Sequence, residues 1–341
     1  MRSTLSGLCK SFMENKERIR AAFAWENSYL HPVCAALFIN QRQIADTDWM
    51  KRCKGILEEQ TGAFSDFRGI AKLSMISYLA LDGNPERRMQ KALMVYDAMK
   101  EHFFSSQYLP VASMMISGLA EKDRYEEIAR RARRIYDLMR KEHPFLTSSE
   151  DSVFAALLAL SEKSDEEVIR EIEDCYRLLK EQFSAGNALQ SLSHALTLGE
   201  GTAKEKCERT IRLYDLLKEK GCKYGTSYEL ATLGVLALLP AKLETIAEEV
   251  AETDAFFGKA KRVWIFWIQQ KAKADARRAD CDQRLYRRER GAKDGSCRCG
   301  WNHRLNRGPA DRHLCGSCGG KRGGIQFQFF FMISFGGVKI L

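Results

Sequence analysis

The stretch IYDLMRKE, residues 135–142, decides the fold because three close variants of it occur elsewhere in the chain. The variants are VYDAMKE, CYRLLKE and LYDLLKE, and the tyrosines of the four copies are 40, 40 and 38 residues apart. Apolar residues around each tyrosine follow the 3.6-residue period of an amphipathic helix. Self-similarity at such a period is typical of a repeat architecture. The four tyrosines are Tyr96, Tyr136, Tyr176 and Tyr214.

A second helical segment, more apolar than the first, follows each copy. These segments occupy residues 109–120, 152–161, 188–198 and 228–239 and are rich in Ala, Gly and Ser. Because they are apolar nearly all round, we expect them to form a buried layer, with the amphipathic helices outside. The period is longer than that of a tetratricopeptide repeat and nearer to the HEAT and armadillo range. The sequence predicts an all-α fold, an α/α superhelix (solenoid) of about five hairpins of about 40 residues each.

Polar turns separate the hairpins and carry helix-start signals. EKSDEEVI, residues 162–169, and GEGTAKEKC, residues 199–207, place Ser or Thr ahead of an acidic first turn. Ser and Thr are favoured N-caps, and Glu in the first turn interacts well with the helix dipole. We therefore expect the outer helices to begin at these turns.

The chain divides into four parts on these patterns. Residues 56–260 form the repeat body, and residues 13–55 form an N-terminal helical cap in front of it. Residues 1–12 fit no pattern, and since Met13 opens a charged helical stretch, we interpret them as a non-native extension. The aromatic residues of the cap are expected to pack in the core: Trp25, Tyr29, Phe38 and Trp49.

The stretches AFAWENSYLHPVCAALFI, residues 22–39, and LSMISYLAL, residues 73–81, together with the repeat, carry a family resemblance. The chain resembles an uncharacterised bacterial family, domain of unknown function 4003, over residues 13–260. The resemblance implies no activity and no catalytic residue that could be transferred. It ends where the chain becomes basic and rich in Cys and Gly.

The net charge of +9 belongs to the last part of the chain. Residues 1–260 hold 36 Lys and Arg against 39 Asp and Glu, whereas residues 261–341 hold 18 against 6. The body therefore has no electrostatic reason to bind nucleic acid, and no segment of it is apolar enough to predict a membrane partner. Six of the eleven cysteines are scattered through the body without the spacing of a disulfide framework, which favours a cytoplasmic location.

Residues 261–341 are interpreted as the product of a frameshift near residue 260. In the +1 frame every Cys codon becomes Val or Ala, and the Cys- and Gly-rich run can become an Ala- and Val-rich helix. One alternative is a zinc site, with His303 or His313 as substitute ligands, although the first Cys pair has one intervening residue where two to four are usual. Another is a disordered basic arm that binds nucleic acid. The candidate zinc ligands are Cys297, Cys299, Cys315 and Cys318.

The histidines and tyrosines of the body have structural interpretations. His102 and His143 fall near helix ends, where a cationic side chain suits the dipole. His194 falls in a buried helix, and we expect it to be a hydrogen-bonded core histidine. The repeated tyrosines are expected to pack between helices, each hydroxyl with one partner.

The chain lacks a Gly-rich phosphate loop and the HExxH and GxSxG motifs, so we assign no catalytic residue and expect no cofactor. The favoured hypothesis is a non-catalytic scaffold that binds an unknown protein or peptide along the concave side of the superhelix. The alternative is an enzyme or small-ligand-binding protein with a site near His31 and Cys34, where the cap meets the first repeats.

Overall fold

The computed structural model describes residues 3–184, 186–222 and 229–257, and within these ranges all regular structure is helical, which confirms the predicted all-α class. Four short 3-10 turns accompany the α-helices: η1 (Ser28–Leu30), η2 (Asp66–Arg68), η3 (Lys122–Arg124) and η4 (Ser149–Asp151). The α-helices are α1 (Ser3–Ala22), α2 (His31–Asn40), α3 (Thr47–Gln60), α4 (Lys72–Ala80), α5 (Pro85–Lys100), α6 (Leu109–Ile116), α7 (Tyr125–Glu142), α8 (Ser152–Leu158), α9 (Asp165–Leu179), α10 (Asn187–Thr197), α11 (Ala203–Glu219), α12 (Glu229–Ala237) and α13 (Leu243–Phe257).

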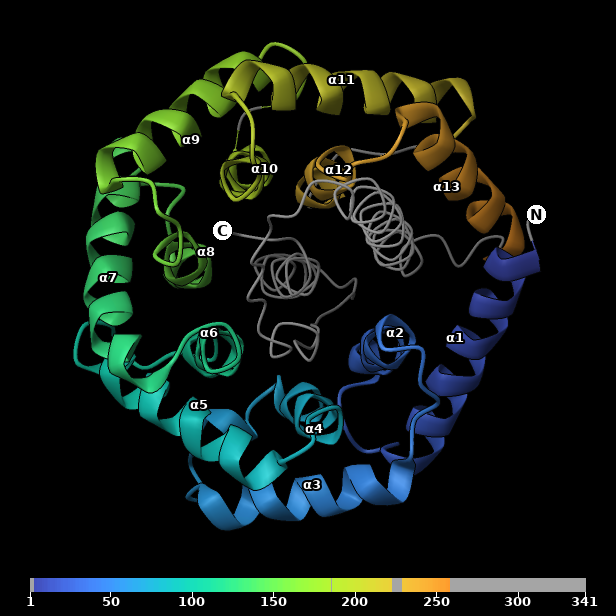
Figure 1. The fold of residues 1–341 in the computed structure, drawn as a ribbon, viewed down its shortest axis with the longest axis vertical. Helices are drawn as coiled ribbons and strands as arrows, with labels where there is room; N and C mark the ends of the chain where they lie inside the picture. Colours follow the sequence, from blue (N-terminus) through green and yellow to red (C-terminus); the bar gives the residue numbers. More distant parts are fainter. Residues whose placement is uncertain (1–2, 185, 223–228, 258–341) are drawn as a thin grey trace, which may run out of the picture.

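The helices form two concentric layers (Figure 1). Odd-numbered helices lie around the outside, and even-numbered helices lie inside and are seen end-on. The amphipathic pattern sets this division, because α7 buries one face, whereas every residue of α6 and α8 is buried. None of the helices in the described ranges combines the length and apolarity that a membrane span requires.

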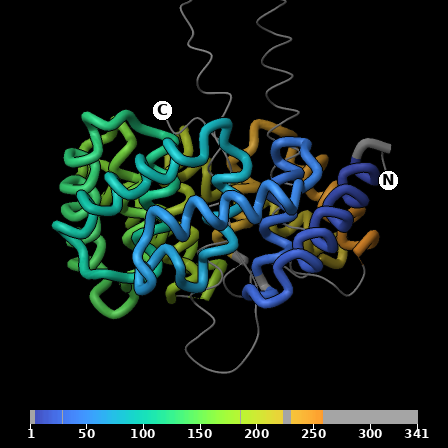
Figure 2. The backbone as a smooth tube through the Cα atoms, turned by 90° about the horizontal axis from the view of Figure 1, so that it is seen from below, coloured from blue at the N-terminus to red at the C-terminus, as the bar shows by residue number. Residues whose placement is uncertain are grey.

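The outer layer closes on itself between α1 and α13. The two helices are in contact, and the ring centroids of Phe12 and Phe257 are 5.6 Å apart in an edge-to-face arrangement. Figure 2 shows the ring from the side, with α1 and α13 at the same edge. The described residues therefore form a closed ring, and the α/α superhelix (solenoid) of about five hairpins stays a prediction. A repeat pattern specifies how each unit packs on the next. The small rotation from unit to unit decides whether the units add up to an open superhelix or to a closed ring, and the pattern is compatible with both.

The N-terminal segment takes part in both layers of the ring. Residues 13–55 contribute half of α1, all of α2 and part of α3, so the predicted cap has the same outer and inner arrangement as the repeats. Leu5, Cys9 and Phe12 are buried on α1, and residues 3–12 thus contribute to the core. That residues 1–12 are non-native stays a prediction.

Side-chain caps fix the starts of the outer helices as the polar turns predict. Ser164 accepts a hydrogen bond from the amide of Glu167, whose carboxylate accepts one from the Ser164 amide, and this capping box begins α9. Thr202 and Glu205 make the same pair at the start of α11. Such caps satisfy amide groups that the first helical turn leaves without partners.

Neighbouring inner helices start beside one another and therefore run in the same direction. Ser105, which precedes α6, donates a hydrogen bond to Asp66, which precedes α4. Gln190 at the start of α10 donates to Thr147, which precedes α8, over 2.9 Å. The connections from outer to inner helices consequently lie along one rim of the ring, and those from inner to outer helices lie along the other.

Basic side chains from the outer layer satisfy the carbonyl groups where inner helices end. Arg131 on α7 donates to the carbonyl oxygens of Ala159 and Ser161 after α8. Arg209 on α11 donates to the carbonyl of Ala237 at the end of α12 over 2.9 Å. Arg131 and Arg209 lie five residues before the repeated tyrosines of their helices, so this bond recurs with the repeat. A cation at a helix C-terminus is also favoured by the dipole.

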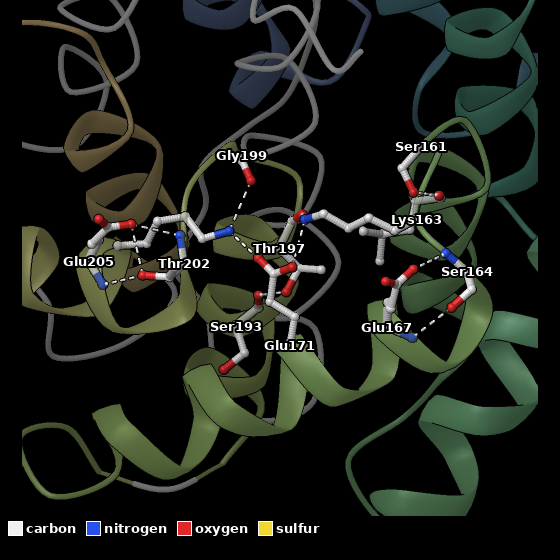
Figure 3. Close-up of polar contacts among 12 residues, drawn as sticks. Ser161, Lys163, Ser164, Glu167, Glu171, Ser193, Thr197, Gly199, Thr202 and Glu205 are labelled. Atoms are coloured by element: carbon white, nitrogen blue, oxygen red, sulfur yellow. Dashed lines mark hydrogen bonds and ion pairs between the residues drawn. The ribbon is translucent and has the colours of Figure 1, made fainter.

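The unit built on α9 uses a different arrangement at this position (Figure 3). Glu171 replaces the arginine and lies between two lysines. The Lys163 ammonium is 2.6 Å from Glu171 and donates to the carbonyl of Thr197 over 3.1 Å. Lys206, only 3% exposed, pairs with Glu171 and donates to the carbonyl of Gly199 over 2.9 Å. Two lysines, both paired with Glu171, thus satisfy the carbonyl groups at the end of α10, whereas a single arginine does so at the ends of α8 and α12.

Candidate functional site

The rim that holds the outer-to-inner connections carries one fully exposed aromatic side chain in each of four successive units. We call this surface the aromatic face and define it as the exposed residues of loops 23–30, 61–71, 101–108 and 143–151. Other aromatic side chains of these loops, such as Phe67 and Phe103, are buried, so the exposure belongs to particular positions. The exposed aromatic residues are Trp25 (102% exposed), Phe64 (102%), Phe104 (94%) and Phe145 (98%).

The aromatic face is also nearly free of exposed charge. Among its described side chains Glu101 alone is both charged and exposed. The remaining exposed residues are small or apolar: Ala24, Ser28, Gly62, Ala63, Gly69, Ile70, Ser105, Pro144, Ser148 and Ser149.

The opposite rim of the same four units has the reverse character. Its exposed apolar side chains are Ile44 (40% exposed) and Leu119 (36%), and no aromatic side chain is exposed in these loops. Loops 41–46, 81–84, 117–124 and 159–164 expose these charged residues: Arg42, Asp46, Glu121, Lys122, Asp123, Arg124 and Glu162. Exposed apolar side chains on one rim and exposed charges on the other indicate that the two rims meet different surroundings.

A buried polar cluster lies at the inner end of loop 143–151. Glu150 and Asp151 are 6% and 1% exposed. The hydroxyl of Tyr108 donates to Glu150 over 3.5 Å, and Asp151 accepts from the Ser148 amide over 2.8 Å. His194 on α10 is fully buried, with Nδ1 3.4 Å from Asp151 Oδ1.

Burial is the main influence on protonation in this cluster. Burial and, to a smaller extent, the neighbouring Asp151 carboxylate together raise the pKa of Glu150 to about 7, against the hydrogen bonds from Tyr108 and Ser148 that lower it. The imidazole of His194 packs on Phe154, with ring centroids 5.1 Å apart, and Nε2 has no hydrogen-bond partner among the described residues. The prediction that His194 lies in the core is confirmed, but the hydrogen bond expected for it is not found within these ranges.

The structure does not support the site that the sequence suggested at His31 and Cys34. His31 is 3% exposed, and Nε2 lies 3.1 Å from the carbonyl oxygen of Phe23. Burial lowers the pKa of His31. Cys34 is fully buried and donates through Sγ to the Leu73 carbonyl over 3.7 Å. Both side chains are enclosed in the core on α2 and have no access to a ligand.

The exposure of Trp25 corrects a second expectation. Trp25 was predicted to pack with the other aromatic residues of the N-terminal segment, and it is fully exposed. Phe38 is buried as predicted, and Trp49 packs partly against the core. Trp25 differs because it lies in the connection between α1 and α2, where neither helix surface is available to cover it.

The repeated tyrosines pack between units, as the sequence predicts. Each packs edge-to-face or tilted against the aromatic residue that follows the preceding outer helix, with ring centroids 4.5–5.5 Å apart. The Tyr96 hydroxyl donates to Asp66 over 2.7 Å. The pairs are Phe67 with Tyr96, Phe103 with Tyr136, His143 with Tyr176, and Phe183 with Tyr214.

His143 thus occupies a position that phenylalanine holds in the other three pairs. Its imidazole also lies 3.0 Å from a carboxylate oxygen of Glu173. We expect His143→Phe to change the free energy of unfolding by less than about 1 kcal/mol, because the ring contact is kept and a partly exposed ion pair is worth little. Urea denaturation checks this, and a loss above about 2 kcal/mol would show that the imidazole has a role the packing does not explain.

One group of possible metal ligands lies beside the aromatic face. Ligand atoms of Glu101, His102 and Glu126 are within 4.8 Å of one another. His102 Nε2 is 3.3 Å from Glu126, and both carboxylates are exposed. This is a surface ion pair with a neighbouring acid, so we assign no metal site to it. The four cysteines of the zinc alternative, and the frameshift interpretation, lie outside the described residues.

The sequence contains a periodic signal for the aromatic face. Trp25, Phe64, Phe104 and Phe145 are 39, 40 and 41 residues apart, the period of the tyrosines, and each precedes an inner helix. The buried cluster had no such signal, since Glu150 and Asp151 stand in a polar turn where exposed acids are usual.

Comparison with known proteins places the chain in a family. The model of the family described as "Protein of unknown function (DUF4003)" matches residues 15–272. The uncharacterized protein YeaA of Bacillus subtilis (strain 168) is 24% identical over 197 residues, which cover 55% of this chain and 59% of that relative. No solved structure matches the chain. Because the family match spans well over half of the sequence, the chain belongs to the protein family of unknown function DUF4003.

Proposed function

We propose that the protein is a non-catalytic scaffold that binds another protein through the aromatic face. The observation that supports this most directly is the recurrence of a fully exposed aromatic residue in the outer-to-inner loop of four successive units. Soluble proteins rarely expose several large apolar side chains together unless the patch contacts a partner. Because the described helices close into a ring, we place the binding surface on this rim and not on a concave side.

The size of the patch is adequate for a specific complex. An aromatic side chain buries about 150–250 Å² when it is covered, so four of them supply roughly 600–1,000 Å². A stable interface of standard size buries about 800 Å² on each partner. The aromatic residues alone therefore approach the area that such an interface requires.

The composition of the patch indicates the chemistry of the partner. Interface cores are enriched in aromatic residues and depleted in charge, and a polar rim surrounds them. Here the uncharged loops are bordered by exposed ends of outer helices that carry both signs, including Lys100, Glu101, Lys141 and Glu142. Mixed charge gives no attraction to an anionic membrane, whereas it suits a protein surface. The expected partner is a protein with an uncharged, apolar face that has pockets for aromatic side chains.

The proposal predicts that binding depends on the aromatic residues and that stability does not. The variant W25S/F64S/F104S/F145S should lose at least about 100-fold in affinity, because exposed aromatic anchors commonly contribute about 2 kcal/mol each or more. Its melting temperature should move by less than about 2 °C, since side chains that are already exposed lose few contacts. The matched control, I44S/L119S on the opposite rim, should bind like the natural protein.

The partner is identified first, with a photo-crosslinking amino acid at Ser28 or Ser148 in host cells, and is then purified and titrated against each variant. Sedimentation with phosphatidylglycerol vesicles and analytical ultracentrifugation of the protein alone test a membrane or a second copy. Failure to crosslink any protein, equal affinity of the serine variant, or aromatic-dependent binding to vesicles would each overturn the proposal.

A further inference from the structure

Loop 143–151 connects the aromatic face directly to the buried cluster. Phe145 is exposed at one end, and Glu150 and Asp151 are buried five and six residues later. Thr147 ties the middle of the loop to α7 and α10, because its hydroxyl donates to the Met139 carbonyl over 3.2 Å and accepts from Gln190. A change at the two carboxylates therefore acts on a short segment whose other end presents Phe145.

The two carboxylates are adjacent in the chain and have little compensating charge. The titratable groups that face them are Tyr108 before α6, Tyr136 on α7 and His194 on α10. Among the described residues no lysine or arginine pairs with either carboxylate. Two ionised carboxylates in so buried a place repel one another and lack solvation, whereas one proton on the pair removes the repulsion and leaves a single buried charge.

An acid in the equivalent loop of another unit has different surroundings. Asp66 in loop 61–71 is partly exposed, has no acidic neighbour in sequence, and accepts hydrogen bonds from Tyr96 and Ser105. The Asp66 carboxylate thus has two hydroxyl donors and contact with water, whereas Glu150 and Asp151 of η4 are adjacent and buried.

We propose that the protonation state of the Glu150–Asp151–His194 cluster controls the seating of loop 143–151: the protonated cluster holds Phe145 in place on the aromatic face, and deprotonation releases it. The effect of this regulation on binding rests on the proposed function. The movement of the loop is independent of it.

The direction follows from the proton balance of the segment. When the loop opens, Glu150 meets water and regains its ordinary pKa of 4.5, against about 7 when the loop is seated. Between these values the seated form holds a proton that the open form releases, so raising the pH favours opening throughout this window. Across the whole window the ratio of open to seated loop rises by up to roughly 300-fold, and it is constant above and below it.

The test is amide hydrogen exchange of residues 143–151 at pH 5 and pH 8, corrected for the intrinsic exchange rate. In the natural protein the opening ratio should be about 70-fold higher at pH 8 than at pH 5, and Glu150→Gln, a neutral isostere of the protonated acid, should abolish the difference. Glu142→Gln, at the exposed end of α7, is the control and should behave like the natural protein. Equal opening at both pH values, or an unchanged pH dependence in Glu150→Gln, would overturn the proposal.

A second measurement needs no variant and no partner. The side-chain carboxyl carbon of Glu150, followed by NMR in the natural protein, should titrate with a midpoint near 7. A midpoint near 4.5, its ordinary value, would overturn the proposed control of loop 143–151 by protonation, even if the aromatic face binds a partner. Hydrogen exchange and NMR both report on the free protein. Their results therefore test the loop proposal even if the binding proposal fails. If both proposals hold, the crosslinked partner binds more tightly at pH 5 than at pH 8, and Glu150→Gln removes that difference.

Discussion

Glu171→Met is expected to lower the free energy of unfolding by about 3 kcal/mol, because it leaves the ammonium of Lys206 buried without its carboxylate. Lys206 is 3% exposed and lies on α11, where it cannot turn to water without leaving the Gly199 carbonyl. Removing one partner of a buried pair is far more harmful than replacing both. Urea denaturation measured against the natural protein gives the value.

Two controls separate this effect from the general cost of changing a charge. Lys204→Met, on the same helix but 77% exposed, should shift stability by less than about 0.5 kcal/mol. The double variant Glu171→Met with Lys206→Met should recover at least half of the loss, since no buried charge remains. If Glu171→Met alone were as stable as the natural protein, the network of Figure 3 would contribute nothing to the end of α10.

Phe12→Ala is expected to lower stability by about 3 kcal/mol, through the cavity that it leaves at the contact between α1 and α13. Phe12 is 3% exposed and packs edge-to-face on Phe257. Hydrogen exchange should show the loss first in α1 and α13, because these two helices hold the closure. Chemical denaturation combined with exchange measures both effects.

The neighbouring Met13 provides the matched control for this change. It lies on the same helix and is 36% exposed, so Met13→Ala should cost less than about 1 kcal/mol. A Phe12→Ala protein whose exchange increases evenly around the ring would contradict the assignment of the closure to this contact.

The layers of the fold could be predicted from the sequence because each depends on local periodicity. The repeated tyrosines give the outer helices, and the apolar segments give the inner ones. Ser164 and Thr202 mark helix starts by a mechanism confined to one turn. Closure could not be predicted, because Phe12 and Phe257 are 245 residues apart and nothing local distinguishes them from other apolar residues of amphipathic helices.

The candidate site was less accessible from the sequence, for two separate reasons. Trp25 was assigned to the core on its type alone, and only its periodicity with Phe64 and the later phenylalanines places it in a loop series. Glu150 and Asp151 are buried beside Tyr108 and His194, and these two residues come from neighbouring units. Burial of this kind depends on residues that are far apart in the sequence, so it cannot be predicted from a short stretch.

Closure of the ring also constrains how many units this fold can contain. An open array grows or shrinks by one repeat without disturbing the others, since each unit meets only its neighbours. In this ring α13 must arrive beside α1, so deleting one hairpin of about 40 residues would leave the outer layer short of a full turn. Insertion of a hairpin would overshoot in the same way. Length variation among relatives is therefore expected inside the loops, whose extension leaves the angle between units unchanged, and the number of hairpins should stay constant.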